Sequence, residues 1–348
     1  MRKTFLFAGM AFALILSACS NSDIKEPESN NQAEKEETTM LDNSLELYEE
    51  FLNNNAKVHI DVDADQDSIY FDFGDDKEQY YNLEELINTI IERHFSEKYE
   101  GEAWLSGVSY AYIDCGNDGS PELALKISTP MGKDGYVAEG WMEYLVIKDI
   151  DGQLRSIYSD IAWSRSRINL NEYGYLCSDG SGGAVNQVFE KAFLDSAGKL
   201  HYIYRDLTTS AVGWGAELWV GRSISIPSGV VDEKNYVILQ FDFNNTSDDY
   251  SDDVFTYVKY VEDSGHDVNE GVRGYFWWDL IDDESIYDLS NPLRLLLENE
   301  GLTVVSRTEI DKMIADKEKS EGLTDEIKNG KQAEWTDLEI TFETVSKV

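Results

Sequence analysis

The chain has 348 residues, of which 42% are hydrophobic and 12% are aromatic. Its 68 acidic residues outnumber its 29 basic residues and give a formal net charge of −39. The hydrophobic fraction is typical of a chain that packs a core, and the length allows one large domain or two of ordinary size. Because so negative a chain repels phosphate backbones, we expect no nucleic-acid partner.

Residues 1–18 have the order of a secretory signal peptide. Arg2 and Lys3 precede an uncharged apolar run that is too short to span a bilayer stably. The run ends in Leu-Ser-Ala immediately before Cys19, and this sequence resembles the lipobox of bacterial lipoproteins. The resemblance implies cleavage before Cys19 and lipid attachment to its sulfur. We therefore expect a protein anchored by lipid to the extracytoplasmic face of the cell membrane.

The rest of the chain is predicted to fall into three parts. Residues 19–40 contain no aromatic residue and are rich in Glu, Asn and Ser, so they are expected to form a disordered tether. Residues 41–100 are predicted to be an N-terminal segment of helical and mixed structure. Residues 101–348 are predicted to be a β-rich body with C-terminal helices.

Apolar residues at helical spacing predict helices at the start of the folded part. One covers 41–52, and a second covers 83–95. Asn82 precedes the second helix, and Glu85 follows three residues later, which is the pattern of a capping box.

Period-two alternation then predicts a series of antiparallel strands with short turns. Asp151-Gly152 is a hairpin signal, and residues 195–199 form another. The predicted strands cover 108–114, 122–127, 144–149, 154–158, 188–194, 200–206 and 235–243.

The C-terminal part is predicted to return to helix. Pro292 stands just inside one helix and Gly301 just beyond its end, and Thr308 is the expected cap of a second helix. The alternating residues 338–345 predict a closing strand. The predicted fold class is α+β, with N-terminal helices, a central antiparallel β-rich body, C-terminal helices and a closing strand.

The loop between two predicted strands, 114–122, has the spacing of calcium ligands. Three carboxylates occupy its first, fifth and ninth positions: Asp114, Asp118 and Glu122. Gly119 occupies the sixth position, where such loops turn, but the third position is Gly116, with Asn117 beside it. The residues leave two interpretations open, a calcium site formed by these side chains or an acidic turn without a metal.

This loop resembles the Asp-rich loop that joins strands in FG-GAP and integrin-like repeat proteins. A wider resemblance links Tyr110–Leu125, Tyr173–Ala184 and Leu47–Val58 to uncharacterised surface lipoproteins of gut Firmicutes of the clostridial type. It implies a surface lipoprotein of unknown activity and transfers no catalytic residue.

Two further groups of residues have two interpretations each. Trp277 and Trp278 are candidate ligand-contacting residues, because exposed rings stack on sugars or contact protein partners; core packing is the alternative. Cys115 and Cys177 fit either a disulfide, which an exported location permits, or two reduced thiols.

None of the four histidines lies in a zinc-type or triad-type motif. We therefore expect a non-catalytic surface lipoprotein that binds an extracellular ligand, with calcium as its candidate cofactor. The alternative is an extracytoplasmic glycan hydrolase that uses paired carboxylates, which requires two acids facing one cleft.

Overall fold

The computed structural model describes ten stretches of the chain: residues 43–61, 78–94, 102–133, 136–183, 186–210, 212–231, 236–246, 249–262, 278–281 and 283–344. All ten stretches belong to one compact unit, Leu41–Val348. The expected signal peptide, Cys19 and tether all lie outside the described residues.

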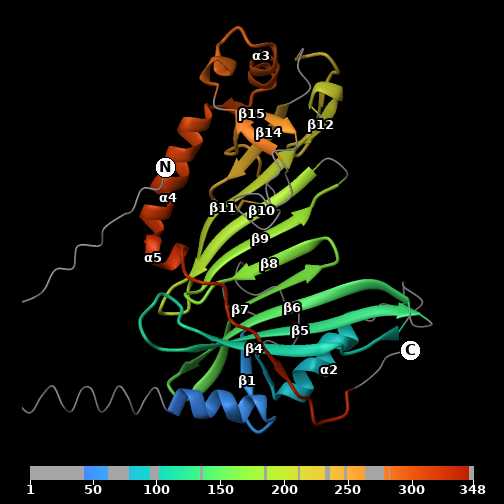
Figure 1. Ribbon diagram of the computed structural model, residues 1–348, viewed down its shortest axis with the longest axis vertical. Helices are drawn as coiled ribbons and strands as arrows, with labels where there is room; N and C mark the ends of the chain where they lie inside the picture. The colour runs from blue at the N-terminus through green and yellow to red at the C-terminus, as the bar shows by residue number, and fades with distance from the viewer. Residues whose placement is uncertain are drawn as a thin grey trace, which may run out of the picture. The chain divides into compact units, whose positions relative to one another are not determined.

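Two eight-stranded sheets form the strand-rich body of the described chain (Figure 1). The first sheet has the order β18 (Thr336–Leu338), β4 (Gly107–Ile113), β5 (Glu122–Lys133), β6 (Tyr136–Ile150), β7 (Gln153–Trp163), β1 (Val58–Asp61) and β2 (Glu78–Tyr81), with β3 (Glu102–Ala103) paired to β5. Its neighbouring strands are antiparallel except for β1 and β7, which are parallel.

The second sheet has the order β16 (Trp278–Ile281), β15 (Val254–Glu262), β14 (Tyr236–Asp242), β11 (Leu200–Thr209), β10 (Asn186–Leu194), β9 (Tyr175–Ser181) and β8 (Ser166–Leu170), with β17 (Thr303–Val304) parallel to β15. A separate hairpin joins β12 (Ala216–Trp219) to β13 (Ser223–Ile226).

Helices lie at both ends of the described chain. A helix over 43–52 and α2 (Leu83–His94) precede most of the strands. The short η1 (Val212–Trp214) lies within the body, and four helical segments follow β16: η2 (Glu284–Tyr287), α3 (Pro292–Asn299), α4 (Arg307–Glu321) and α5 (Asp325–Lys328).

The first sheet is covered on both faces, so side chains that point to opposite faces of one strand are both buried. Leu123 and Leu125 pack with the helix over 43–52 and α2 in one core. Ala124, between them in the sequence, points the other way and joins a second core shared with Leu176 and Ala192 of the second sheet. This second core places the two sheets in contact.

The second sheet is covered by helices along other parts of its surface. Ile310 of α4 and Ile327 of α5 pack against its aromatic residues. The β12–β13 hairpin, η2 and α3 form a further core with Tyr257 and other residues of β14 and β15. Figure 1 shows α3 and β12 at the end of the molecule opposite α2.

Several predicted elements are confirmed at their boundaries. Asn82 accepts from the Glu85 amide at 2.9 Å, and Glu85 accepts from the Asn82 amide at 3.0 Å, which is the predicted capping box. The hairpin turns at Asp151-Gly152 and 195–199 join β6 to β7 and β10 to β11. The α3 helix has Pro292 in its first turn, and Gly301 follows it with φ of +83°.

Two boundary predictions are wrong. The cap of α4 is Ser306 and not Thr308, because Ser306 and Glu309 form a reciprocal capping box two residues earlier. The closing strand, predicted over 338–345, is β18 over Thr336–Leu338, which pairs with β4 as the edge strand of the first sheet.

Candidate functional site

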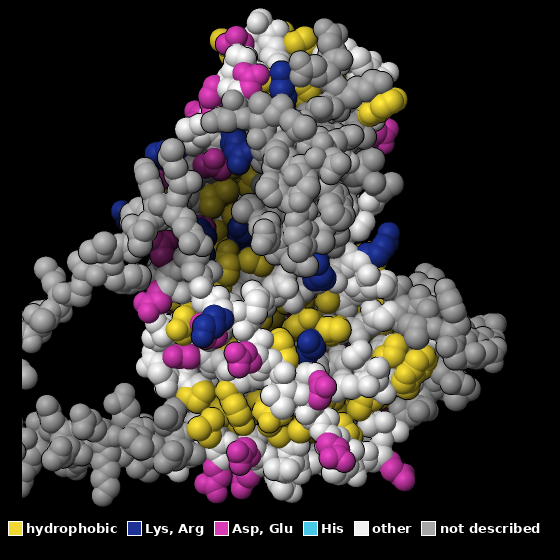
Figure 2. All heavy atoms as spheres, viewed as in Figure 1, with side chains coloured by type: hydrophobic (Ala, Val, Ile, Leu, Met, Phe, Trp, Pro, Cys, Tyr) yellow, Lys and Arg dark blue, Asp and Glu magenta, His cyan; other side chains and the backbone are white. Residues whose placement is uncertain are grey.

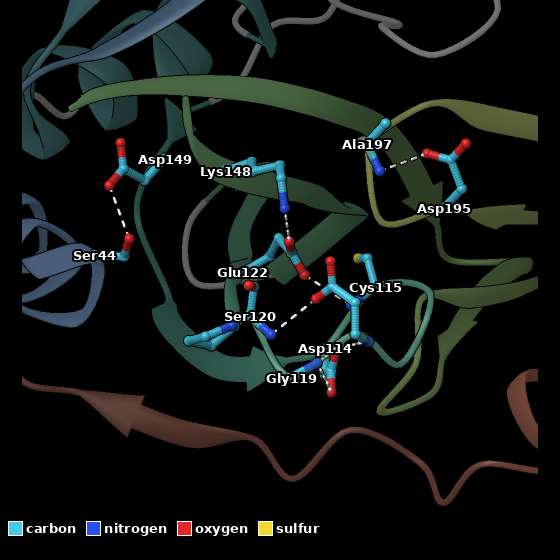
Figure 3. Close-up of polar contacts among 12 residues, drawn as sticks. Ser44, Asp114, Cys115, Gly119, Ser120, Glu122, Lys148, Asp149, Asp195 and Ala197 are labelled. Carbon is cyan, nitrogen blue, oxygen red and sulfur yellow. Dashed lines mark hydrogen bonds and ion pairs between the residues drawn. The ribbon is translucent and has the colours of Figure 1, made fainter. Parts of the chain in front are cut away.

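The predicted calcium loop connects β4 to β5, as the sequence indicated, and its first two carboxylates close the turn. Figure 3 shows Asp114 beside the backbone of Gly119. Asp114 accepts hydrogen bonds from the backbone amides of Asp118 at 2.8 Å and Gly119 at 3.0 Å. Asp118 accepts in turn from the amide of Ser120 at 2.8 Å. Asn117 is exposed and has a left-handed φ of +58°.

The third predicted ligand, Glu122, has another partner. Its side chain is fully buried and forms an ion pair with Lys148 of β6, and it accepts from the Cys115 amide at 2.7 Å (Figure 3). Although burial opposes a charge on Lys148, the hydrogen bond to Glu122 raises the pKa of Lys148 above its ordinary value. Glu122 therefore faces a cation of the protein itself.

The absence of a ligand at the third position of the loop has a steric cause. Gly116 has a φ of +77°, and a Cβ atom there would lie 2.5 Å from the backbone nitrogen of Ser196 in the β10–β11 turn. A side chain at this position would collide with backbone, so the carboxylate of the FG-GAP pattern has no room. Among the described residues, no group of three or more His, Cys, Asp or Glu side chains has an arrangement that holds a metal ion.

A pocket of about 220 Å³ lies where the two sheets meet. Its lining comes from both sheets: Tyr158, Ser159 and Asp160 of β7, Leu176 and Ser178 of β9, Glu190 and Ala192 of β10, Leu200 and Tyr202 of β11, and Asn245. We call it the intersheet pocket. It combines two carboxyl groups and two tyrosines with an apolar surface from leucine and alanine.

Asp160 is the carboxyl group whose environment is most clearly defined in the intersheet pocket. It accepts from the buried Tyr158 hydroxyl at 3.1 Å and from the Ile161 amide at 2.7 Å. Burial raises the pKa of Asp160 above its ordinary value, and these two hydrogen bonds only partly oppose the shift. Neither partner brings a positive charge.

A second pocket, of about 360 Å³, adjoins the first and shares Leu200, Tyr202 and Asn245 with it. The other residues of its lining are Gly198, Lys199, His201, Phe243, Asn244, Lys317 and Glu321. His201 contacts a carboxylate at each ring nitrogen, with Asp195 at 2.9 Å from Nε2 and Glu321 at 3.1 Å from Nδ1. The imidazole also stacks on Phe193, with ring centroids 4.8 Å apart.

The remaining candidate residues have mixed outcomes. Trp277 lies outside the described residues. Trp278 is the first residue of β16, and the structure describes its backbone alone. Cys115 and Cys177 are free thiols in the structure. The acidic side chains are spread over the face seen in Figure 2 and do not gather at one point of it.

Sequence reasoning missed the intersheet pocket, although its residues follow a regular pattern. Tyr158 and Asp160 are two residues apart on β7, and Glu190 and Ala192 are two apart on β10, so each pair lies on one face of its strand. The spacing indicates shared faces within a strand. It does not indicate that β7 and β10, which belong to different sheets, line the same pocket.

No family model, curated protein or solved structure matches the chain. In the described part of the chain, no helix has both the length and the apolar character needed to cross a membrane.

Proposed function

We propose that the protein is a lipid-anchored extracytoplasmic lipoprotein that binds a small ligand without transforming it. The observation that carries the proposal is the intersheet pocket, where carboxyl groups and tyrosines stand beside apolar side chains. Such a mixture of apolar surface and a few polar groups is typical of small-ligand sites. At about 220 Å³ the pocket is smaller than the ~300–1,000 Å³ of sites for drug-sized molecules, so the ligand is small.

The ligand-binding part is tested by filling the pocket. Ala192 is buried and lines it, so Ala192→Phe places a ring in the space where the ligand would lie. We expect small amines, sugars or carboxylic acids in a thermal-shift screen to stabilise the wild-type mature lipoprotein and not the filled variant. A screen in which no compound binds, or in which filling changes nothing, contradicts the proposal. Ser178→Phe provides a second filled variant.

The anchor part depends on Cys19 and the apolar run before it. We expect intact-mass analysis of protein from the native membrane to find a lipid-modified Cys19 at the N-terminus. Cys19→Ser removes the sulfur and is expected to release the protein from the membrane fraction. An unmodified N-terminus on membrane-bound protein contradicts the anchor.

The proposal also includes one calcium ion bound in the loop from Asp114 to Glu122. Oxygen atoms of Asp114, Asp118 and Asn117 would be its ligands. The alternative is a turn closed by its own hydrogen bonds, which needs no ion. Calorimetric titration of the mature lipoprotein is expected to give a Kd of about 10⁻⁴–10⁻³ M, the range of extracellular modules. The double variant Asp114→Asn, Asp118→Asn keeps oxygen acceptors for the turn and removes the charge, so it is expected to lose the heat. If the wild type gives no heat, the calcium site is contradicted and the loop is an acidic turn without a metal.

A glycan hydrolase is the second candidate function, because Asp160 and Glu190 from facing sheets line one pocket. The raised pKa of Asp160 is the property that a general acid needs in this chemistry. Chromogenic glycosides test it: a hydrolase loses turnover in both Asp160→Asn and Glu190→Gln. No turnover by the wild type on any glycoside supports the non-catalytic proposal.

A further inference from the structure

The charges that line the intersheet pocket have one sign. Asp160 and Glu190 both contribute carboxyl groups, and no lysine or arginine is among its lining residues. Lys199 and Lys317 line the adjoining pocket instead, where Lys317 pairs with Glu321 at 2.7 Å. The intersheet pocket is therefore suited to a positively charged ligand.

The environment of Asp160 also favours a positively charged ligand. A carboxylate taken out of water is costly unless a cation accompanies it. The Tyr158 hydroxyl and the Ile161 amide satisfy part of its hydrogen-bonding capacity but carry no charge. A cation in the pocket would supply the missing counter-charge.

The other walls distinguish an organic cation from a metal ion. Leu176, Ala192 and Leu200 give apolar contacts for a carbon chain, and the tyrosine rings of Tyr158 and Tyr202 suit a neighbouring ammonium group. A hard metal ion prefers a shell of several charged oxygens, and the lining of the intersheet pocket contains two carboxyl groups, those of Asp160 and Glu190.

We infer that the intersheet pocket binds the ammonium group of a small organic amine, with Asp160 as its anion and the leucine and alanine side chains against its carbon chain. This inference rests on the proposed ligand-binding function and names its ligand class. The ammonium nitrogen donates to Asp160, and the Glu190 side chain lines the same pocket.

The test uses pentylamine and 1-pentanol, which share a carbon chain and differ in charge. Calorimetry on the mature lipoprotein is expected to show pentylamine binding at least tenfold more tightly than pentanol. Asp160→Asn is expected to weaken pentylamine binding at least tenfold. Asp337→Asn, on the exposed edge strand β18, removes the same charge away from the pocket and is expected to leave binding unchanged.

The possible failures are distinguishable. If pentanol or a neutral sugar binds as well as pentylamine and Ala192→Phe abolishes that binding, the pocket is a ligand site and the amine inference is wrong. If no probe binds, both the inference and the proposed function fail. Should Asp160→Asn not fold, equal affinities of pentylamine and pentanol for the wild type still overturn the inference.

Discussion

The buried ion pair between Glu122 and Lys148 fixes the start of β5 to β6. Glu122 is fully buried, and the Lys148 side chain is 15% exposed. The backbone amide of Cys115 provides a further hydrogen bond to the Glu122 carboxylate. The pair therefore holds the loop that precedes β5 as well as the two strands.

We predict that Lys148→Met lowers the free energy of unfolding by about 3–5 kcal/mol, because Glu122 is then a buried carboxylate without a cation. Urea unfolding measures the change. The control is Lys57→Met: Lys57 and Glu85 are 2.9 Å apart, but their side chains are 50% and 46% exposed, so a loss below about 1 kcal/mol is expected. Equal losses in the two variants would show that burial does not govern these pairs.

At the scale of elements, His201 joins the β10–β11 hairpin to the C-terminal end of α4. Its two ring nitrogens face Asp195 of the hairpin turn and Glu321 of the helix. A ring nitrogen that carries a hydrogen donates to the carboxylate that faces it. Burial opposes the charge on Asp195, but hydrogen bonds from His201 and from backbone amides lower the pKa of Asp195 below its ordinary value. Hydrogen bonds from Lys317 and His201 lower the pKa of Glu321.

A depressed carboxyl pKa stabilises the fold at pH values above the ordinary pKa, and this stabilisation is lost as the pH falls through the folded-state value. The ordinary values are 3.8 for Asp195 and 4.5 for Glu321. We therefore predict that the stability advantage of the wild type over His201→Gln shrinks as the pH is lowered from about 5 towards 3. Urea unfolding at a series of pH values measures it.

Lys312→Gln is the control for this pH series, because Lys312 lies on the same helix and pairs with Asp316 at the exposed surface. Its difference from the wild type is expected to stay below about 1 kcal/mol at every pH. An advantage of the wild type over His201→Gln that grows on acidification would contradict the assigned hydrogen bonds.

The elements that sequence patterns predicted well are those whose signals are local. The capping box of Asn82 and Glu85, the Asp151-Gly152 turn and the α3 boundaries involve residues close together in the chain, and all three are confirmed. The α4 cap is predicted two residues too late because Ser306 and Thr308 are both residue types that cap helices, and Ser306 is the one that forms a capping box, with Glu309.

The sequence predicts those features of the candidate site that depend on residues close together in the chain. The spacing of Asp114 and Asp118 gave the loop, but the pairing of Glu122 with Lys148 depends on a strand partner 26 residues away. The intersheet pocket depends on which faces of the two sheets meet. That arrangement results from long-range packing and leaves no signal in the spacing of Asp160 or Glu190.

At the scale of the whole molecule, the segment between α5 and β18 connects the two sheets (Figure 1). The Ala333 amide donates to the Leu170 carbonyl at the end of β8, and the following residues pair with β4 of the first sheet. Trp335 lies between these contacts, with its ring 6.1 Å from that of Tyr144 and the Lys126 ammonium 4.7 Å from its centroid.

We predict that Trp335→Ala lowers the free energy of unfolding by about 2 kcal/mol, less than the ~3–5 kcal/mol of a fully buried tryptophan because the ring is partly exposed. The matched control is Trp219→Ala: Trp219 is 56% exposed on β12, and a change within about 0.5 kcal/mol is expected. Urea unfolding of both variants gives the comparison. Similar losses would mean that Trp335 contributes no more than a surface ring, and that the strand pairing of β18 alone attaches this segment to the first sheet.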